Sequence, residues 1–332
     1  MATVILEGPG RFRVADTSQP GTPGPDEVLV RVLEVGICGT DLHAFEGTQA
    51  YFTYPRILGH ELAVEVLTTG AAVGGFKPGD LCAVNPYQTC GVCEACRGGR
   101  TNCCAKMRVI GVHTEGGMRD RMLLPAKQLY KCTDLPPVQV PLVETLAVGL
   151  HAVGRSGAQS GERAIVLGAG PIGLSVIEFL RLAGADVAVV EKIPERLTFA
   201  AGNFALKRHY PSHEEARQEA PWALVFDCTG DRGSMEQSLH LLEQGGKLIF
   251  VGLINDHVSL FDPDIHRREA TILSSRNSTP AEQCHALRAM EGKQIDIGAW
   301  PTEYATVTSM AGRFPAWLHR EAGVVKAVVS WS

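Results

Sequence analysis

The sequence predicts an α/β protein with two domains, and three observations support this prediction. The chain has 332 residues, which is more than one ordinary hydrophobic core holds. Residues 1 to about 145 form short stretches rich in β-branched residues, and glycine and proline interrupt them. From Ala164 onward, apolar strands alternate with helical segments, which is typical of a parallel sheet with crossover helices.

The first half of the chain is expected to be all-β. Its strands should span residues 27–38, 57–70 and 80–87, where apolar residues alternate with polar ones. Turns such as GTPGPDE and GGFKPGD bound these strands, because glycine and proline set the backbone angles that a turn requires.

The second half of the chain repeats a unit of one strand and one helix. The expected strands are residues 163–167, 186–191, 223–230 and 247–253, and the expected helices are 171–185, 194–205 and 233–246. A further helix over 279–293 and a last strand over 324–332 complete the chain.

The distribution of charge excludes several classes of partner. The net charge is −5, and the absence of a long basic run argues against nucleic acid or a membrane surface as the partner. The most apolar stretch, 164–190, contains Glu178, Arg181 and Asp186, which is too much charge for a membrane span. Because the N-terminus has no apolar run of signal-peptide length, we expect a cytoplasmic protein.

Four cysteines lie close together in a stretch rich in loops. Cys90, Cys93, Cys96 and Cys104 form the pattern C-x2-C-x2-C-x7-C. Four thiolates complete the tetrahedral shell of a structural zinc ion, and such a metal can fold a segment that has no core. The alternative, a group of disulfides, is disfavoured in a reducing compartment. Cys103 could supply the fourth sulfur in place of Cys104, and the sequence leaves this open.

A glycine-rich turn separates the first strand and the first helix of the second half. Residues 168–173 have the pattern G-x-G-x-x-G, in which glycine permits a tight turn, close approach of a pyrophosphate and close packing of the helix. A dinucleotide cofactor is therefore expected. Its predicted contacts, which include the ends of two later strands, are Gly168, Gly170, Pro171, Ile172, Gly173, Thr229, Gly230, Val251 and Gly252.

Glu191 ends the strand that follows this helix. A carboxylate at this place can accept hydrogen bonds from both adenosine ribose hydroxyls and would repel a 2′-phosphate, so NAD is predicted rather than NADP. The alternative is an ordinary acidic residue at a strand end. Lys192 and Arg196 are also predicted to lie near the cofactor, and their positive charge works against the preference for NAD.

Three further residues have the chemistry of a catalytic zinc site. Cys38 and His60 lie at the ends of predicted strands, and Glu144 precedes the second half. A thiolate, an imidazole and a carboxylate would leave the fourth position of zinc to water or substrate. Each has an ordinary alternative, as a buried apolar cysteine, a hydrogen-bonded histidine or a solvated glutamate. Because the three are distant in sequence, spacing alone cannot assemble them.

The motifs GICGTDLH, LGHE, the four-cysteine stretch and GAGPIG occur in this order along essentially the whole chain. In these motifs the sequence resembles the zinc-dependent medium-chain alcohol dehydrogenases, in particular the sorbitol and polyol dehydrogenase branch. The resemblance implies a GroES-like, β-rich catalytic domain over 1–147, completed by about 292–332, and a Rossmann NAD-binding domain over 148–291. It also implies two zinc ions per chain, one catalytic and one structural, and a homodimer or homotetramer.

The resemblance also assigns the catalytic metal. It implies that Cys38 and His60 bind the catalytic zinc and that Glu144 is the third ligand. Glu61 matches a glutamate that can approach the metal or hold its water. Asp41 is expected to accept a hydrogen bond from His60 and to fix its tautomer.

Other residues are assigned to proton transfer and to the cofactor. Thr40 matches the hydroxyl that takes the proton of the substrate, and His43 is the next group toward solvent. Lys326 occupies a place where a basic residue reaches the cofactor phosphates. His113 and His151 are expected to be structural.

The chain departs from the family pattern at one position and offers a hint about the substrate. Val64 replaces a glycine that usually follows the GHE motif, which brings the local strand packing into question. The segment GVHTEGGMRDR contains Arg119 and Arg121, and either could hold a substrate carboxylate through paired hydrogen bonds. The alternative is that both arginines are solvated.

The predicted reaction is the oxidation of a secondary alcohol of a polyol or sugar acid to a ketone, with hydride transfer to NAD. A carboxylate such as Glu144 in place of a second thiolate makes zinc a harder Lewis acid, which suits a vicinal diol. The alternatives are a simple alcohol or L-threonine dehydrogenase and, in another class, a non-catalytic protein that carries zinc and NAD as a structural or redox-sensing module.

Overall fold

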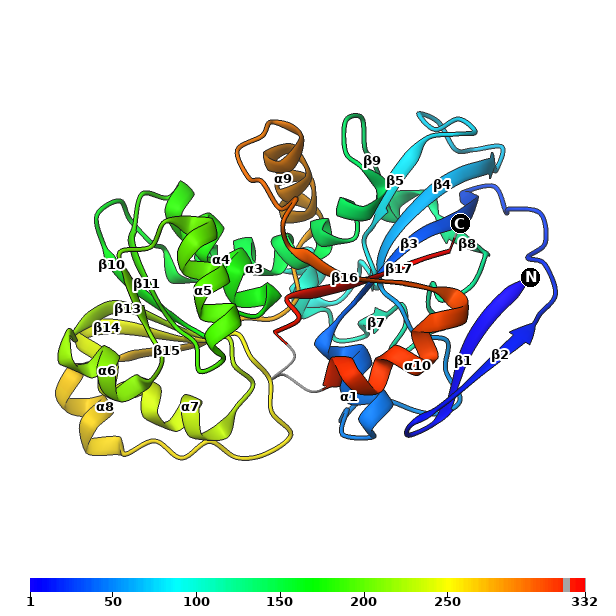
Figure 1. The fold of residues 1–332 in the computed structure, drawn as a ribbon. Helices are drawn as coiled ribbons and strands as arrows, with labels where there is room; N and C mark the ends of the chain where they lie inside the picture. The colour runs from blue at the N-terminus through cyan, green and yellow to red at the C-terminus, as the bar shows by residue number, and fades with distance from the viewer. Residues whose placement is uncertain (319–322, 332) are drawn as a thin grey trace. The chain divides into compact units, whose positions relative to one another are not determined.

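The computed structural model of the protein describes residues 1–318 and 323–331 (Figure 1). The chain divides into two compact units. Unit 1 comprises Met1–Glu144 and Thr279–Ser332, and unit 2 comprises Thr145–Ser278. The domain limits at residues 147 and 291 stay a prediction. Among the described helices, none combines the length and the apolar character that crossing a membrane requires.

Unit 1 is built on a mixed sheet. In sheet order its strands are β16 (Pro301–Thr306), β17 (Lys326–Ser330), β3 (Glu27–Ile37), β4 (Glu61–Thr69), β5 (Leu81–Val84) and β9 (Leu129–Lys131), and β8 (Arg121–Pro125) also pairs with β3. Because β17 pairs antiparallel with β3, the C-terminal segment completes the sheet of the first half.

Shorter elements surround this sheet. The hairpin β1 (Ala2–Gly8) and β2 (Arg11–Asp16) opens the chain, and β6 (Tyr87–Gln88) pairs with β7 (Arg108–Val109). The helices and 3-10 turns are α1 (Gly39–Glu46), α2 (Glu94–Arg97), η1 (Thr101–Cys103), η2 (Ala126–Gln128), η3 (Pro137–Gln139), α9 (Pro280–Glu291) and α10 (Val307–Leu318), while α3 (Leu142–Ser156) begins in unit 1 and ends in unit 2.

The expectation that the first half is all-β is wrong at α1. The carboxylate of Asp41 accepts a hydrogen bond from the backbone N–H of Cys38 (3.0 Å), and this bond starts the helix directly after β3. The strand predicted over 57–70 begins only at Glu61, because Gly59 has a φ of +92° and turns the chain before it.

The core of unit 1 joins α1 to the sheet. Val28, Val30 and Val32 alternate along β3 and are fully buried. Phe45 of α1 packs on Phe314 of α10, with ring centroids 5.2 Å apart. Because β3 and α1 share this core, the residue between them, Cys38, is held on a rigid support.

Unit 2 contains a sheet of six parallel strands, which confirms the predicted α/β class. In sheet order the strands are β12 (Arg208–Tyr210), β11 (Asp186–Val190), β10 (Arg163–Leu167), β13 (Trp222–Asp227), β14 (Leu242–Phe250) and β15 (Thr271–Ser274). Its other elements are α4 (Pro171–Leu182), α5 (Pro194–Phe204), α6 (His213–Gln218), α7 (Arg232–Ser238), η4 (Leu239–Leu241) and α8 (Asp262–Arg268).

The strand order of unit 2 reverses between β10 and β13. From β10 the chain runs outward through β11 to β12, and it then returns to β13 on the other side of β10. In open parallel sheets, ligands bind at the carboxyl ends of the strands where the order reverses. Gly168 follows β10 and Thr229 follows β13, so the predicted cofactor residues lie at this point.

Candidate functional site

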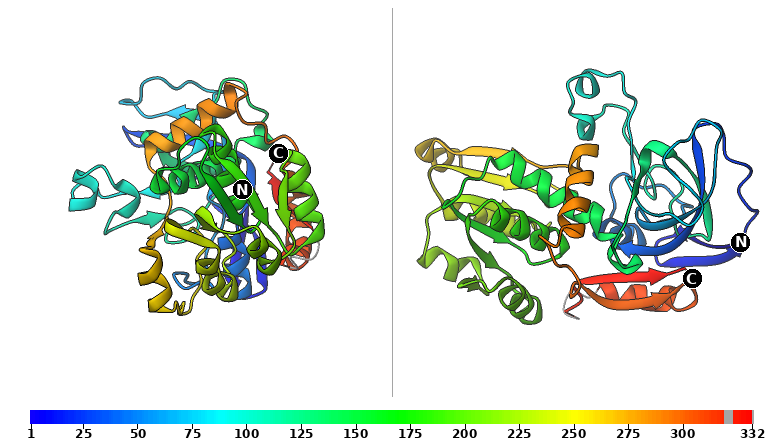
Figure 2. Two further views of the ribbon diagram at one scale, coloured as in Figure 1. Left: turned by 90° about the vertical axis from the view of Figure 1, so that its left-hand side faces the viewer. Right: turned by 90° about the horizontal axis from the view of Figure 1, so that it is seen from above.

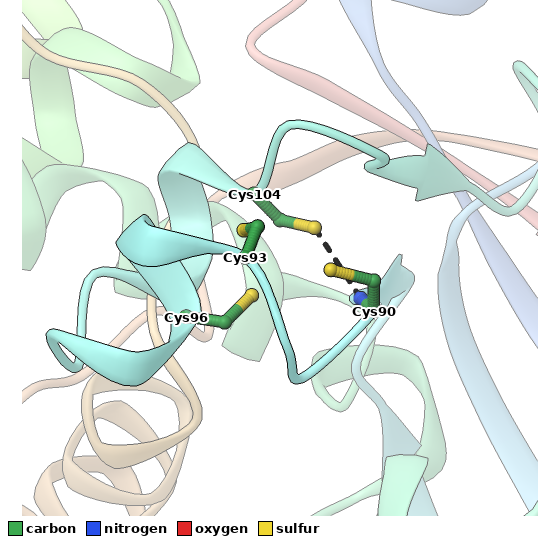
Figure 3. A group of neighbouring side chains, drawn as sticks. All are labelled: Cys90, Cys93, Cys96 and Cys104. Carbon is green, nitrogen blue, oxygen red and sulfur yellow. Dashed lines mark hydrogen bonds between the residues drawn. The ribbon is translucent and has the colours of Figure 1, made fainter.

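The loop of residues 90–104 between β6 and β7, called here the cysteine lobe, projects away from the sheet of unit 1 in both views of Figure 2. In this lobe the sulfur atoms of Cys90, Cys93, Cys96 and Cys104 all lie within 4.8 Å of one another (Figure 3). The backbone N–H of Cys90 donates to the Sγ of Cys104 (3.3 Å). Four converging sulfurs of this kind fit a structural zinc ion.

The environment of the lobe also shifts the pKa values of its thiols. Hydrogen bonds from backbone N–H groups lower the pKa of Cys93 to about 6. Desolvation and neighbouring thiols raise the pKa of Cys96 to about 12. Cys103 is exposed and lies outside the group, whereas Cys104 is buried within it, so the structure favours Cys104 as the fourth ligand.

A second group of possible ligands lies at the end of the unit 1 sheet. Cys38 directly follows β3, His60 directly precedes β4, and Glu61 is the first residue of β4. These strands are antiparallel, with Gly36 opposite Glu61, so their ends meet. The ligand atoms of Cys38, His60 and Glu61 lie within 4.8 Å of one another.

Asp41 ties the two ligand-bearing segments together. Its Oδ2 accepts from the N–H of Cys38 (3.0 Å), and its Oδ1 accepts from the N–H of Gly59 (3.3 Å). The predicted hydrogen bond from His60 to Asp41 is wrong, because Nδ1 of His60 lies 3.8 Å from Oδ1. The two backbone N–H groups fix the carboxylate at that distance, and it acts on His60 through its charge.

His60 is buried among acidic groups. Burial by itself lowers the pKa of His60, but the charges of Asp41 and of the Cys38 thiolate outweigh it and raise that pKa well above its ordinary value. In the described part of the chain, Nδ1 of His60 has no hydrogen-bond partner. An unpartnered, buried imidazole nitrogen beside a thiolate and a carboxylate fits a metal cation.

Glu144 lies beside Cys38, His60 and Glu61 but does not belong to this group of converging ligand atoms. Its charge acts on His60, and its Oε1 accepts a hydrogen bond from the hydroxyl of Tyr87. Burial raises the pKa of Glu144, although the charge of His60 opposes the shift. Burial also raises the pKa of Tyr87 well above its usual range, and the charge of Glu144 adds to this effect. We call Cys38, His60, Glu61 and Glu144 the metal-site cluster.

Lys326 forms a buried ion pair with Glu61. Burial lowers the pKa of Lys326, but the charges of Glu61 and Cys38 outweigh this and raise it. The predicted contact of Lys326 with the cofactor phosphates stays a prediction. The sequence did not indicate this pair or Tyr87, because neither has a local signal beyond the position of Tyr87 three residues before the cysteine lobe.

The predicted proton-transfer residues lie on α1. Thr40 and His43 are three positions apart, so they share one face of the helix. Nδ1 of His43 lies 3.1 Å from the hydroxyl of Thr48, and that hydroxyl lies 3.0 Å from the carboxylate of Glu46. The side chains of His43 and Glu46 are about half exposed, so this chain of polar groups ends in solvent.

In unit 2 the glycine turn has the space that a dinucleotide requires. A Cβ on Gly173 would collide with the carbonyl oxygen of Gly168, so α4 packs closely on the turn. A Cβ on Gly170 would meet nothing within 4 Å, which leaves the backbone open to a ligand. Thr229 packs against Gly168, and Gly252 packs against Gly230, so the predicted residues of the strand ends gather here.

Glu191 has a structural role that the sequence did not indicate. It is buried, and its two oxygens accept from the backbone N–H groups of Ala169 (2.8 Å) and Ile193 (2.9 Å). The carboxylate therefore connects the glycine turn to the segment after β11. Lys192 is exposed and Arg196 is half-buried, and the preference between NAD and NADP stays a prediction.

The remaining predicted residues have varied surroundings. Arg119 is half-buried, its Nε has no hydrogen-bond partner in the described part of the chain, and burial lowers its pKa. Among the described residues, no hydrogen bond or ion pair joins Arg119 to the metal-site cluster. Arg121 is exposed on β8. Nδ1 of His113 accepts from the N–H of Val109 (3.1 Å), and Val64 is fully buried within β4, so the sheet accommodates it.

Two family models match the chain. The alcohol dehydrogenase GroES-like domain matches residues 24–136, and the zinc-binding dehydrogenase matches residues 171–291. L-galactonate-5-dehydrogenase of Escherichia coli is 35% identical over 316 residues, which cover 93% of each chain. The chain belongs to the zinc-binding alcohol dehydrogenase family. The GroES-like and Rossmann architectures predicted for this zinc dehydrogenase are confirmed.

Solved structures of other dehydrogenases have the same fold as this zinc dehydrogenase. A Sinorhizobium meliloti protein with NADP bound superposes with a TM-score of 0.91 at 30% identity, over 99% of each chain. Galactitol-1-phosphate dehydrogenase of Escherichia coli superposes with a TM-score of 0.91 at 25% identity, over 100% of each chain.

Two separate ligand sets predict two zinc ions per chain. Cys93→Ser should remove one zinc ion and lower the unfolding temperature, because a structural zinc contributes on the order of 10 kcal/mol to folding. His60→Ala should remove the other zinc ion, abolish turnover and leave the unfolding temperature nearly unchanged. Metal analysis and thermal unfolding would measure both effects.

The matched control is Cys103→Ser, which changes an exposed cysteine next to the lobe and should retain both metals. The opposite result would reverse the assignment of the two sites. In that case the His60 variant would lose stability, and the Cys93 variant would lose turnover but keep its stability.

Proposed function

We propose that this zinc dehydrogenase oxidises a secondary alcohol of a polyol or sugar acid to a ketone, with NAD as the hydride acceptor. The observation that carries the proposal is the metal-site cluster, which gathers one thiol, one imidazole and two carboxylates in unit 1. Such a set can hold zinc and leave a position open to substrate. The name of the L-galactonate-5-dehydrogenase relative, which indicates a sugar-acid substrate, supports the substrate class.

The residues of the chain have distinct roles in this reaction. Cys38 and His60, with Glu144 or Glu61, would hold zinc, which when bound supplies Lewis-acid chemistry that lowers the pKa of an alcohol. The hydroxyl of Thr40 accepts the proton of the alcohol and gives its own proton to His43.

His43 then passes that proton toward Thr48 and solvent. The open backbone at Gly170 and the N-terminus of α4 bind the pyrophosphate of the cofactor, whose nicotinamide ring supplies the hydride chemistry.

An assay of cofactor reduction tests the proposal. Polyols, aldonates, amino alcohols and simple alcohols would each be offered with NAD and with NADP. We expect faster reduction with polyols or aldonates than with ethanol or threonine. If the protein binds both zinc and NAD but no alcohol reduces the cofactor, it is the non-catalytic alternative.

We further propose that the protein forms a homodimer or homotetramer. Light scattering would measure its oligomeric state.

A sugar acid should be a better substrate than its matching neutral polyol. Arg119 is the proposed carboxylate contact, because its Nε is buried without a partner and the turn before it is bonded to the residue preceding His60 (Gly117 N to Gly59 O, 2.9 Å). Arg119→Ala should raise the KM for the acid roughly tenfold to a hundredfold, the size of a lost charge-assisted contact, and leave the polyol KM unchanged.

The control for this experiment is Arg121→Ala, which removes an exposed arginine from the adjacent strand. Equal changes for acid and polyol in the Arg119 variant would show that the residue acts through the fold and would remove the carboxylate contact.

The kcat/KM should be higher with NAD than with NADP, and Glu191→Ala should reduce this difference. The carboxylate is already fixed by two backbone N–H groups, so accepting hydrogen bonds from a ribose diol would cost little further side-chain entropy. We expect the ratio of kcat/KM for the two cofactors to fall roughly tenfold to a hundredfold. Because the glycine turn also loses a bond, the KM for NAD should rise.

Glu195→Ala serves as the control, since this acid lies nearby in the first turn of α5 and is exposed. A native enzyme that already prefers NADP would contradict the role of Glu191 and would indicate that Lys192 and Arg196 determine the preference.

A further inference from the structure

Tyr87 contacts the metal-site cluster through its hydroxyl. The side chain is 9% exposed, and the hydroxyl donates a hydrogen bond to Oε1 of Glu144, which is 6% exposed. A hydrogen bond from a hydroxyl to a buried carboxylate is short and strong, and it fixes the orientation of the acceptor. Both residues belong to unit 1, so this contact does not depend on unit 2.

We propose that Tyr87 is a positioning residue for the zinc ligand Glu144. By occupying Oε1, its hydroxyl leaves Oε2 as the oxygen available to the metal and makes the carboxylate a ligand through one oxygen. A carboxylate that binds through one oxygen keeps another coordination position free for the alcohol. This inference rests on the catalytic zinc of the proposed function.

The partners of the two carboxylates support this role. Glu61 is paired with the ammonium of Lys326, so a positive charge already offsets its negative charge. Tyr87 is neutral, so its hydrogen bond holds Glu144 in place without adding a positive charge. The charges of His60 and Lys326 also act on Glu144. Glu61, however, is in a direct ion pair, and a dication is attracted more strongly to a carboxylate that is not. Tyr87 therefore keeps Glu144 available as a zinc ligand beside the group of Cys38, His60 and Glu61.

The backbone of Tyr87 is fixed from both sides. Its N–H donates to Oδ1 of the buried Asn85 (3.0 Å). The N–H of Asn85 donates to the carbonyl of Gln128, and Nε2 of Gln128 donates to the carbonyl of Asn85 (2.8 Å each). On the other side, Tyr87 pairs with Val109 across the neck of the cysteine lobe. The hydroxyl is thus in place before a metal binds, which is the condition for a support that orients a ligand.

The test is the release of zinc from the holoenzyme to a chelator. Tyr87→Phe removes the hydroxyl and keeps the ring, so the packing should persist. We expect one of the two zinc ions to bind tenfold to a hundredfold more weakly, the usual effect of removing a group that orients a metal ligand, while the zinc of the cysteine lobe is unchanged. Replacement by Co²⁺ should also give an altered visible spectrum at the catalytic site.

Tyr210→Phe is the matched control, because Tyr210 is equally buried (8% exposed) but lies in unit 2. It should leave both zinc affinities unchanged. Thermal unfolding of the two variants would show whether the Tyr87 variant keeps its fold.

A double-mutant cycle with Glu144→Ala separates positioning from a general effect on the fold. In that background Tyr87→Phe should cause no further loss of zinc affinity. An equal loss in both backgrounds, or no loss in the single variant, would overturn the inference. Since zinc release requires no substrate, this result is independent of which alcohol the enzyme oxidises, and a failed substrate screen would count only against the proposed function.

Discussion

The metal-site cluster depends on the buried carboxylate of Asp41. This side chain is 1% exposed and accepts hydrogen bonds from the backbone of Cys38 and of Gly59, the residue before His60. One group thereby sets the distance between two segments that are separated along the chain by all of α1 and the loop after it. These bonds join the start of α1 to the turn at Gly59, in addition to the pairing of β3 with β4.

The same carboxylate contributes to a surplus of negative charge. Asp41, Glu61 and Glu144 are buried beside the half-buried Cys38, and the cationic groups that the described residues place among them are Lys326 and His60, whose pKa values are raised. Burial raises the pKa values of Asp41 and Glu144, which means that the ionised forms are costly in this environment. A divalent cation would offset this cost, which favours metal binding at this site.

Sequence reasoning succeeded where the chemistry is local. The four cysteines of the lobe and the turn from Gly168 to Gly173 are nearly contiguous, so residue type and spacing predict what they hold. Cys38, His60 and Glu144 are far apart in the chain, and only the resemblance to a family brought them together in advance. The short helix α1 was missed because its cap, the bond from Cys38 to Asp41, leaves no pattern of apolar residues.

Tertiary contacts account for the rest of what the sequence did not indicate. The expected bond between Asp41 and His60 is replaced by two bonds to backbone N–H groups, and a motif does not reveal which donor a buried carboxylate takes. Tyr87 meets Glu144 because of the pairing of β6 with β7, and Lys326 meets Glu61 because β17 joins the sheet beside β3. These contacts follow from the topology rather than from a spacing.

The central claim is that Asp41 holds the two metal-binding segments in register, and the zinc content of Asp41→Asn tests it most directly. This variant keeps the size of the side chain but loses the charge and one acceptor. Metal analysis after dialysis against a chelator should find two zinc ions in the native protein and one in the variant, with the cysteine lobe still occupied. Two zinc ions in the variant, released as slowly as in the native protein, would contradict this account.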